Sequence, residues 1–344
     1  MDDFYRQAVT LCDVDVIPFS AAVGFDGYID KLLRVVRTTG ETPVFYDTIS
    51  ELSKVIGGMA NLSGELELHT IDVRIGGNAP LFAVATAALG GRCLLAGATE
   101  DAAFVDMPQA VDRIDLSPPG QTLALEFDDG KVMFADVVSM RGLEVQVLEN
   151  TELWQRAMRG FNAADLCAIV NWSAATWMHT LWESVADHIT SRNKLPYVFL
   201  DLADLEKRTS SDVNKLVELI GRFDPAGTVL GLNEKESVQL STRLVCAPHS
   251  LAARLGCGVL IHSLGYSELN STRNIIRRQC PVVQKPLMTT GAGDHFNAAF
   301  CFAMMHKVPA ETALDFANAV AGCFVKTGQS PDRAEVKAYL MQLQ

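Results

Sequence analysis

The chain has 344 residues, of which 49 % are hydrophobic and 20 % are charged, so it can bury a large core and is not disordered. Its 29 Lys and Arg residues against 41 Asp and Glu give a net charge of −12, which argues against nucleic-acid or anionic-membrane partners. The N-terminal segment MDDFYRQAVT lacks the pattern of a secretory signal, and no apolar run reaches the length of a membrane span. The eight Cys residues form no C-x-x-C pair, and we expect a cytoplasmic protein with reduced thiols.

Short apolar runs recur along the chain and predict buried strands of the kind found in parallel sheets. They lie at 19–25, 92–98, 165–172, 197–202, 228–233 and 258–263. Between them, patterns of helical spacing predict helices over 80–90, 176–193 and 211–223. This alternation predicts an α/β fold with a doubly wound, mostly parallel sheet flanked by helices.

Two regions interrupt the alternation. Residues 28–75 contain strand-like pieces around a segment with helical spacing. Residues 121–137 alternate on either side of an Asp-Asp-Gly turn at 128–130, which predicts a hairpin. Because no linker or repeat is present, we expect one domain over 1–344, with a small β lid formed by approximately 28–75 and 121–137.

The segment TTGAGDHF at 289–296 opens an apolar helix and carries the strongest functional signal. Gly291 and Gly293 remove side chains where a backbone approaches a ligand, and the free N–H groups of the following helix favour a phosphate. Asp294 beside an anion suggests a general base, which accepts a proton from an attacking hydroxyl during phosphoryl transfer. A simple capped turn, with Thr290 or Asp294 as the N-cap, is the alternative explanation.

The longer segment TTGAGDHFNAAF strongly resembles the C-terminal signature of the ribokinase-like (PfkB-type) carbohydrate kinases. This resemblance implies that Asp294 is the catalytic base and that the backbone of Gly291, Ala292 and Gly293 forms the anion hole. Other landmarks of the family follow in order over roughly residues 20–330.

Two N-terminal segments resemble the substrate side of the family. The glycine pair that enters the helical segment RIGGNAPLFAVATAALGG at 74–91 implies that the substrate hydroxyls face Gly76, Gly77 and Asn78. The segment VGFDGYIDKLL resembles the strand that leads to a substrate-binding aspartate, for which Asp30 is the better match and Asp26 the alternative. A carboxylate suits a polyol because it accepts from two hydroxyls at once. An exposed Asp-Gly turn at 26–27 is the competing explanation.

The nucleotide side of the family is matched by shorter motifs. The segment LGLNEKE resembles an Asn-x-x-Glu element, which implies that Asn233 and Glu236 help to organise Mg²⁺ beside ATP, with Glu236 acting indirectly through water. Taken alone, these residues are only a polar helix start. The other nucleotide-site candidates that the resemblance implies are Ser263, Gly265, Thr290 and Asn318.

The sequence also departs from the family pattern. Met288 stands where an Asp of the family helps to hold an activating monovalent cation, which leaves that cation in doubt. Leu81 replaces an Asn of the substrate site, and His262-Ser263 occupies the strand end where Thr-x-Gly is commoner. We interpret His295 as a capping or supporting group rather than a catalyst.

The resemblance makes an ATP-dependent kinase the leading hypothesis, with γ-phosphate transfer from ATP to a hydroxyl of a sugar or related polyol. One alternative is a nucleoside kinase of the same fold, in which Phe45, Tyr46 or Phe82 stacks on the base. Another is a non-catalytic member that only binds sugar or nucleotide, against which the retained Asp294 argues. The resemblance also implies a homodimer formed through the lid.

Overall fold

The computed structural model describes residues 5–40, 42–192 and 194–343. The expected domain (1–344), lid (28–75) and helix (176–193) each include residues outside these ranges. The described residues form a nine-stranded sheet in the order β14-β13-β12-β11-β10-β9-β1-β5-β6. Its strands are β1 (Ser20–Gly24), β5 (Arg92–Gly97), β6 (Val111–Asp115), β9 (Leu166–Ile169), β10 (Tyr197–Asp201), β11 (Thr228–Asn233), β12 (Gly258–His262), β13 (Tyr266–Asn270) and β14 (Ile275–Gln279).

The order and direction of these strands confirm the predicted fold class. From β12 to β6 all neighbours pair in parallel, and only β13 and β14 at one edge are antiparallel. The six runs predicted as strands correspond to β1, β5, β9, β10, β11 and β12. The two edge strands, β6 and β14, and β13 beside β14 were not predicted.

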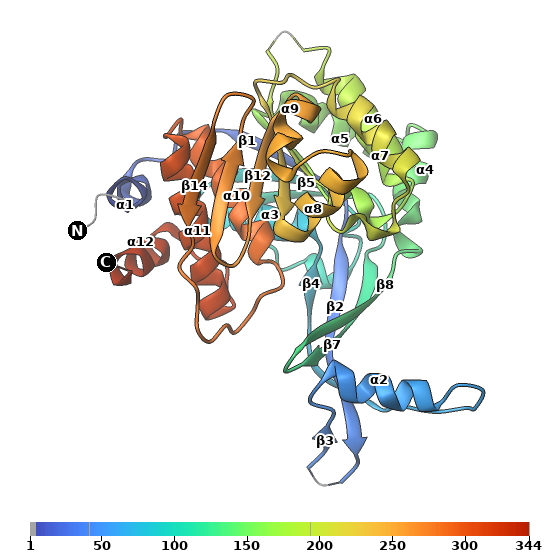
Figure 1. The fold of residues 1–344 in the computed structure, drawn as a ribbon. Coiled ribbons are helices and arrows are strands. Elements are labelled where there is room, and N and C mark those ends of the chain that lie inside the picture. Colours follow the sequence, from blue (N-terminus) through green and yellow to red (C-terminus); the bar gives the residue numbers. More distant parts are fainter. Residues whose placement is uncertain (1–4, 41, 193, 344) are drawn as a thin grey trace.

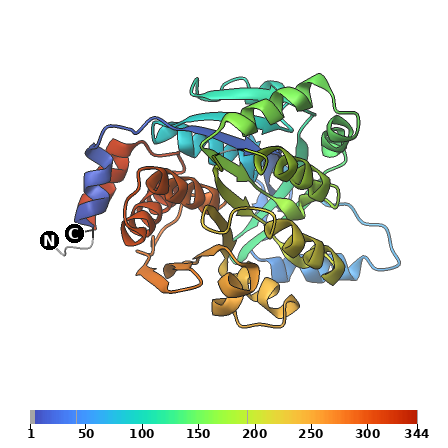
Figure 2. The same cartoon turned by 90° about the horizontal axis from the view of Figure 1, so that it is seen from above.

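Helices cover both faces of this sheet (Figures 1 and 2). One face is covered by α1 (Arg6–Asp13), α3 (Asn78–Ala88), α10 (Ala292–Met305), α11 (Ala310–Thr327) and α12 (Arg333–Gln342). The other is covered by α4 (Gly142–Leu148), α5 (Glu152–Ala163), α6 (Met178–Ile189), α7 (Ser210–Ile220), α8 (Glu234–Arg243) and α9 (Leu251–Leu255). In the described ranges, none of the helices is both long and apolar enough for a membrane crossing.

Helix α10 is apolar on all sides because it lies between the sheet and α11. Phe296, Phe300 and Phe302 are at most 2 % exposed. A helix that is apolar all round is stable only when it is buried in this way. This packing fixes the first turn of α10, with its Gly-Ala-Gly-Asp sequence, against the body of the protein.

A second sheet protrudes from the body (Figure 1). It has five strands within the described residues, namely β2 (Tyr28–Thr38), β3 (Val44–Phe45), β4 (Leu68–Gly76), β7 (Gly120–Phe127) and β8 (Gly130–Asp136). The hairpin predicted at 121–137 is present as β7 and β8. At the outer end, α2 (Ile49–Gly58) packs Leu52 onto Leu33, Val35, Leu125 and Phe127. The segments expected to form a lid therefore build one sheet with its own small core.

Candidate active site

Polar side chains follow the carboxyl ends of the parallel strands. Asp26 follows β1, Asn171 follows β9, and Asp201, Asn233 and His262 are the last residues of β10, β11 and β12. The carboxyl ends of parallel strands lie at one edge of a sheet, where open α/β proteins bind their ligands. Of the expected site residues, Asp26 and Asn233 lie at this edge.

Asp26 holds the start of α3 in place. Its carboxylate accepts hydrogen bonds from the backbone N–H groups of Asn78 and Ala79 at 2.9 and 2.8 Å, and from Asn171 Nδ2 at 2.7 Å. The side chain is completely buried, so the alternative of an exposed Asp-Gly turn is wrong. Burial raises the pKa of Asp26, while these hydrogen bonds act in the opposite direction.

Asp30, on β2 of the second sheet, depends on a glycine that lies diagonally across from it on β4, where Arg74 is its direct partner. In the β2–β4 pairing, a Cβ atom on Gly76 would lie only 2.2 Å from Asp30 Oδ2, so only glycine leaves room for the carboxylate. Burial raises the pKa of Asp30, and a Thr122 hydrogen bond and the charges of Arg74 and Lys131 lower it.

Asp30 lines a cavity of about 620 Å³ between the second sheet and the body. The expected residues Gly77, Asn78 and Asp294 line it too, whereas Asp26 and Gly76 lie behind its wall. Leu81, at the departure from the family pattern, also contributes to the wall. The other polar side chains of its lining include Thr122, Asn171, Ser173, Asp204, Glu206, Lys207 and Thr290.

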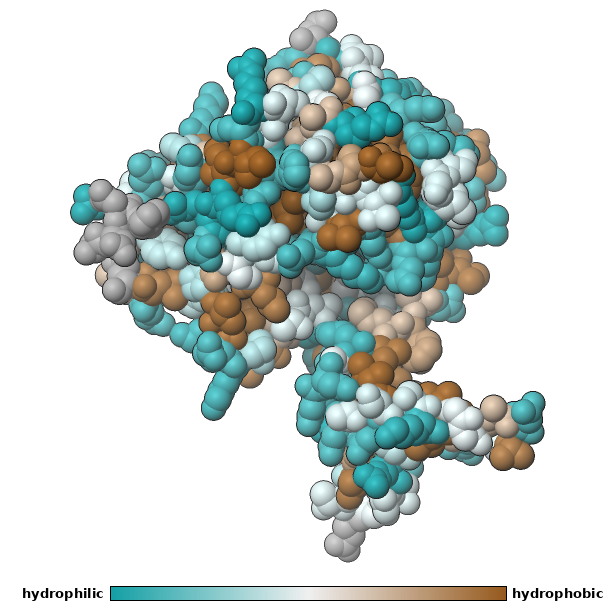
Figure 3. Space-filling model, viewed as in Figure 1, coloured by the Kyte–Doolittle hydropathy of each residue, from teal (hydrophilic) through white to brown (hydrophobic). Residues whose placement is uncertain are grey.

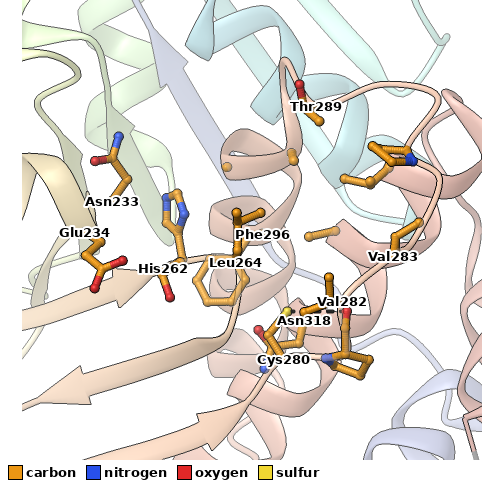
Figure 4. Close-up of a pocket in the computed structure, with 18 of the residues that line it drawn as sticks. Asn233, Glu234, His262, Leu264, Cys280, Val282, Val283, Thr289, Phe296 and Asn318 are labelled. Carbon is orange, nitrogen blue, oxygen red and sulfur yellow. Dashed lines mark hydrogen bonds between the residues drawn. The ribbon is translucent and has the colours of Figure 1, made fainter. Parts of the chain in front are cut away.

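A second cavity, of about 430 Å³, lies on the other side of the first turn of α10 (Figure 4). One end is polar, with Asn233 and His262, and the other is apolar, with Val282 and Val283. Asn318 and Ser263 line this cavity, as expected for the nucleotide site. Gly265 lies outside its lining and turns the chain between β12 and β13, where the Ser263 hydroxyl accepts from its N–H at 3.3 Å. Thr290, expected beside the nucleotide, lies in the first cavity, while Thr289 lines the second.

The first turn of α10 separates the two cavities. Gly291 is the N-cap at φ +92°, a conformation that favours glycine. Among the described residues, no backbone or side-chain acceptor is bonded to the amides of Gly291 and Gly293, whereas the N–H of Ala292 donates to the Thr289 carbonyl at 3.2 Å. In this conformation, two of the three expected anion-hole amides are free for a ligand.

Burial raises the pKa of Asp294 well above its usual value, and the negative charges of Asp201, Asp26 and Glu236 raise it further. A carboxylate with a raised pKa at the bottom of a cavity is suited to accept a proton. His295, the next residue, bonds the Gly291 carbonyl and the Ser330 hydroxyl, both at 2.7 Å. His295 therefore supports the glycine turn through these contacts, in agreement with the expectation that it is a supporting group.

Asn233 and Glu236 form a capping box at the start of α8. The Asn233 side chain accepts from the Glu236 N–H at 2.9 Å, and Glu236 accepts from the Asn233 N–H at 2.8 Å. Burial raises the pKa of Glu236 to about 7. Burial, followed by the charge of Glu236, also raises the pKa of Asp201, which accepts from Asn297 Nδ2 at 2.9 Å. Both residues thus have the capping role, whereas only Asn233 lines the cavity of about 430 Å³ and Glu236 lies outside its lining.

Two cations of the second sheet contact the segment that leads into α10. Lys131, on β8, donates to the hydroxyl of Thr290 and to Glu126 Oε1, the latter at 3.2 Å. Arg74, on β4, lies 2.9 Å from Met288 Sδ. The second sheet therefore touches the glycine loop directly.

Sequence reasoning missed several of these residues. Asn171, Asp201 and Lys131 were not selected, although Asn171 and Asp201 end apolar runs that were predicted as strands. A polar residue at a strand end was the available signal for these two. Lys131 gave no signal, because its partner Thr290 is 159 residues away.

A family model described as prokaryotic ketohexokinase matches residues 4–343. The chain belongs to the prokaryotic ketohexokinase family. A ketohexokinase from Haloferax volcanii is 27 % identical over 340 residues, which cover 92 % of this chain and 89 % of that protein. As expected from the sequence, the protein is an ATP-dependent sugar kinase of the ribokinase-like (PfkB-type) class.

The fold of this family member is similar to that of solved ribokinases. The ribokinase of Arabidopsis thaliana, complexed with ribose and ATP, has a TM-score of 0.64 at 19 % identity, over 94 % of this chain and 98 % of that chain. A putative ribokinase II from E. coli, in complex with ATP and Mg²⁺, has a TM-score of 0.67 at 13 % identity, over 95 % of this chain and 100 % of that chain. At these identities the similarity shows the fold alone.

Proposed function

We propose that the protein transfers the γ-phosphate of ATP to a hydroxyl of a ketohexose, with Asp294 as the general base. The observation that carries this proposal is the position of the first turn of α10 between the two cavities. Ala292 and Gly293 line the cavity of about 430 Å³, and Asp294 lines the cavity of about 620 Å³. A phosphate at this turn is therefore adjacent both to bound nucleotide and to a sugar hydroxyl.

The residues of each cavity have distinct tasks in this mechanism. Asp30 and Asn78 bind the sugar hydroxyls, and Asp294 accepts the proton of the attacking hydroxyl. The amides of Gly291 and Gly293 stabilise the charge that develops on the transferred group. The apolar end of the nucleotide cavity suits a nucleobase, and Asn318 lies there with its Nδ2 atom bonded to Ser267 at 2.9 Å.

The donor set at the sheet edge fits Mg²⁺. Asp201 and Glu236 are buried carboxylates with raised pKa values; burial is the main cause in both, the charge of Glu236 adds to the shift of Asp201, and the charge of Asp204 adds to that of Glu236. A divalent cation nearby compensates such charges, and Mg²⁺ prefers oxygen ligands with retained water. Asn233 and Glu236 would orient its waters, and Mg²⁺ would neutralise charge on the ATP phosphates.

The lining of the acceptor cavity favours a sugar over a nucleoside. Of the aromatic residues expected to stack on a base, Phe82 is 1 % exposed and packs against Phe199, with ring centroids 5.8 Å apart. Phe45 contacts His69, and Tyr46 packs on the small core under α2. Tyr28 is the one aromatic side chain that lines this cavity in the described part of the chain. Most of the residues that line the cavity carry hydrogen-bonding side chains, as a polyol requires.

We also propose that the second sheet is a lid. The contact of Lys131 with Thr290 joins it to the glycine loop, so the sheet covers the acceptor cavity. A closed lid excludes water, which would otherwise compete with the sugar for the phosphoryl group.

The lid is the proposed interface of a homodimer. Leu123 and Phe134 pair directly across β7 and β8, and they are 36 % and 56 % exposed. Val73 on β4 is 53 % exposed, and apolar surface is visible along the protruding arm (Figure 3). We expect Phe134→Lys to reduce the mass measured by sedimentation from dimer to monomer, while Leu148→Lys on α4 leaves it unchanged. A monomeric wild-type protein would contradict the dimer.

The kinase proposal is tested by ADP release with Mg-ATP across a panel of ketohexoses, aldoses and nucleosides. We expect a ketohexose to stimulate turnover most, and Asp294→Asn to lower kcat by about 10²–10⁴-fold. Asp204→Asn is a matched control, because Asp204 lines the same cavity. Mg-ATP binding by Asp294→Asn, measured by calorimetry, should persist. Equal kcat values for the two variants would refute the assigned base, and stimulation by nucleosides alone would refute the acceptor class.

A further inference from the structure

His262 is the polar last residue of an otherwise apolar strand. In β12, Val259, Leu260 and Ile261 are at most 3 % exposed, and His262 follows them as the last residue. It pairs with Asn233 in the register of β12 with β11. The imidazole thus lies at the carboxyl edge of the sheet, where it lines the nucleotide cavity.

The surroundings of the ring fix its orientation. His262 packs on Phe296 of α10, with ring centroids 5.2 Å apart. A Cβ atom on Gly293 would lie 3.0 Å from His262 Cε1 and 3.2 Å from its Nε2. Gly293 therefore makes room for the ring, which lies directly against the first turn of α10 (Figure 4).

The ring nitrogens of His262 make no hydrogen bond and no ion pair with any described residue. The other histidines packed around α10 differ: His295 uses both nitrogens, and His306 accepts from the Ile17 N–H and bonds the Phe302 carbonyl. His262 is partly exposed, so its ring nitrogens open onto the cavity and are not sealed in the core, which leaves them available to a bound ligand. Since the ring lines the nucleotide cavity, a bound ligand would supply the missing partner.

We propose that His262 binds the phosphate chain of the nucleotide, donating a ring N–H to a non-bridging phosphate oxygen. This inference rests on the proposed function, because it assumes that ATP occupies the cavity of about 430 Å³.

The position of the His262 ring favours contact with the phosphate chain of the nucleotide over contact with its base. Its neighbours, Asn233 and Gly293, belong to the polar end of the cavity and to the anion-hole turn. The end formed by Val282 and Val283 is apolar and suits the base. Burial lowers the pKa of His262 to about 4, so at neutral pH the ring is uncharged and carries one N–H. A donor that packing holds in place needs little reorganisation when the ligand binds.

Calorimetry with MgATP, MgADP and adenosine tests this inference without any sugar. His262→Val continues the apolar strand and should weaken MgATP and MgADP binding by about 10–100-fold, as expected for a hydrogen bond to a charged group. Adenosine affinity should stay unchanged. His262→Gln keeps an N–H donor and should recover part of the affinity. His188→Val serves as a control, because His188 lies on the exposed surface of α6.

The ratio of MgADP affinity to adenosine affinity separates this role from a structural one, because a purely structural His262 would leave that ratio unaltered. Equal weakening of adenosine and MgADP, or no weakening of either, would overturn the inference. If His262→Val fails to fold, the comparison of MgADP with adenosine in His262→Gln decides in the same way. Wild-type protein that binds no MgATP would instead refute the proposed function itself.

Discussion

The contact between Lys131 and Thr290 joins the second sheet to the glycine loop, and its removal should open the proposed lid. A hydrogen bond to a charged group contributes about 1.5–3 kcal/mol. The Lys131 side chain is 25 % exposed and is shared with Glu126, so solvent screening reduces this to about 1 kcal/mol. If the contact forms only when the lid is closed, Lys131→Met should shift the closed-to-open ratio about fivefold toward the open state.

Steady-state kinetics with the best sugar of the panel measure this shift. We expect the KM for sugar to rise about fivefold in Lys131→Met, and ATP hydrolysis without sugar to rise because water enters the site. Lys54→Met is the matched control. Lys54 is an exposed cation on α2, at the outer end of the second sheet and outside the acceptor cavity.

A double-mutant cycle with Thr290→Val decides whether the two side chains act through each other. Coupling predicts that Lys131→Met/Thr290→Val raises KM no more than the larger single effect, with an interaction of about 1 kcal/mol. Independent, additive effects would refute the reasoning. So would a KM for Lys131→Met equal to that of Lys54→Met.

Two further predictions follow from the site. Gly76→Ala should raise the Kd for sugar by about tenfold or more, because a Cβ atom there would lie 2.2 Å from Asp30 Oδ2. The affinity for MgATP should stay unchanged. Calorimetry with each ligand measures both affinities. Burial lowers the pKa of His295 to about 4, so its contribution to folding is complete above pH 6.5 and is lost as pH falls toward 4. Urea unfolding at pH 7.5 and 4.5 should therefore show wild type losing up to about 3 kcal/mol relative to His295→Phe; a constant difference would contradict this.

The sequence predicted those parts of the fold that rest on local patterns. Residues 228–233 form a continuous apolar run bounded by polar residues, and β11 occupies the same range. Buried parallel strands leave this signal because both of their faces are covered. The antiparallel strands β13 and β14 leave no such run, because β13 buries the polar residues Ser267, Glu268 and Asn270, and β14 alternates between exposed and half-buried residues.

For the candidate site, too, the sequence predicted local motifs but not contacts between remote residues. The anion-hole turn is a contiguous motif, so 289–296 could be recognised without the fold. Asp201 and Lys131 act through neighbours that are remote in sequence, such as Asn297 for Asp201 and Thr290 for Lys131. Their positions follow only once the strands are ordered and the second sheet lies over α10.

Gly76 and Gly293, one in each glycine motif, have the same steric role. At Gly76 the missing Cβ leaves space for the Asp30 carboxylate, and at Gly293 it leaves space for the His262 ring. Each glycine therefore marks a place where a side chain from another strand approaches the backbone closely. A motif glycine predicts such an approach but not the side chain that makes it. The chemistry of a carbohydrate kinase can thus be recognised from its glycines, whereas its acceptor and nucleotide contacts depend on the residues that those glycines admit.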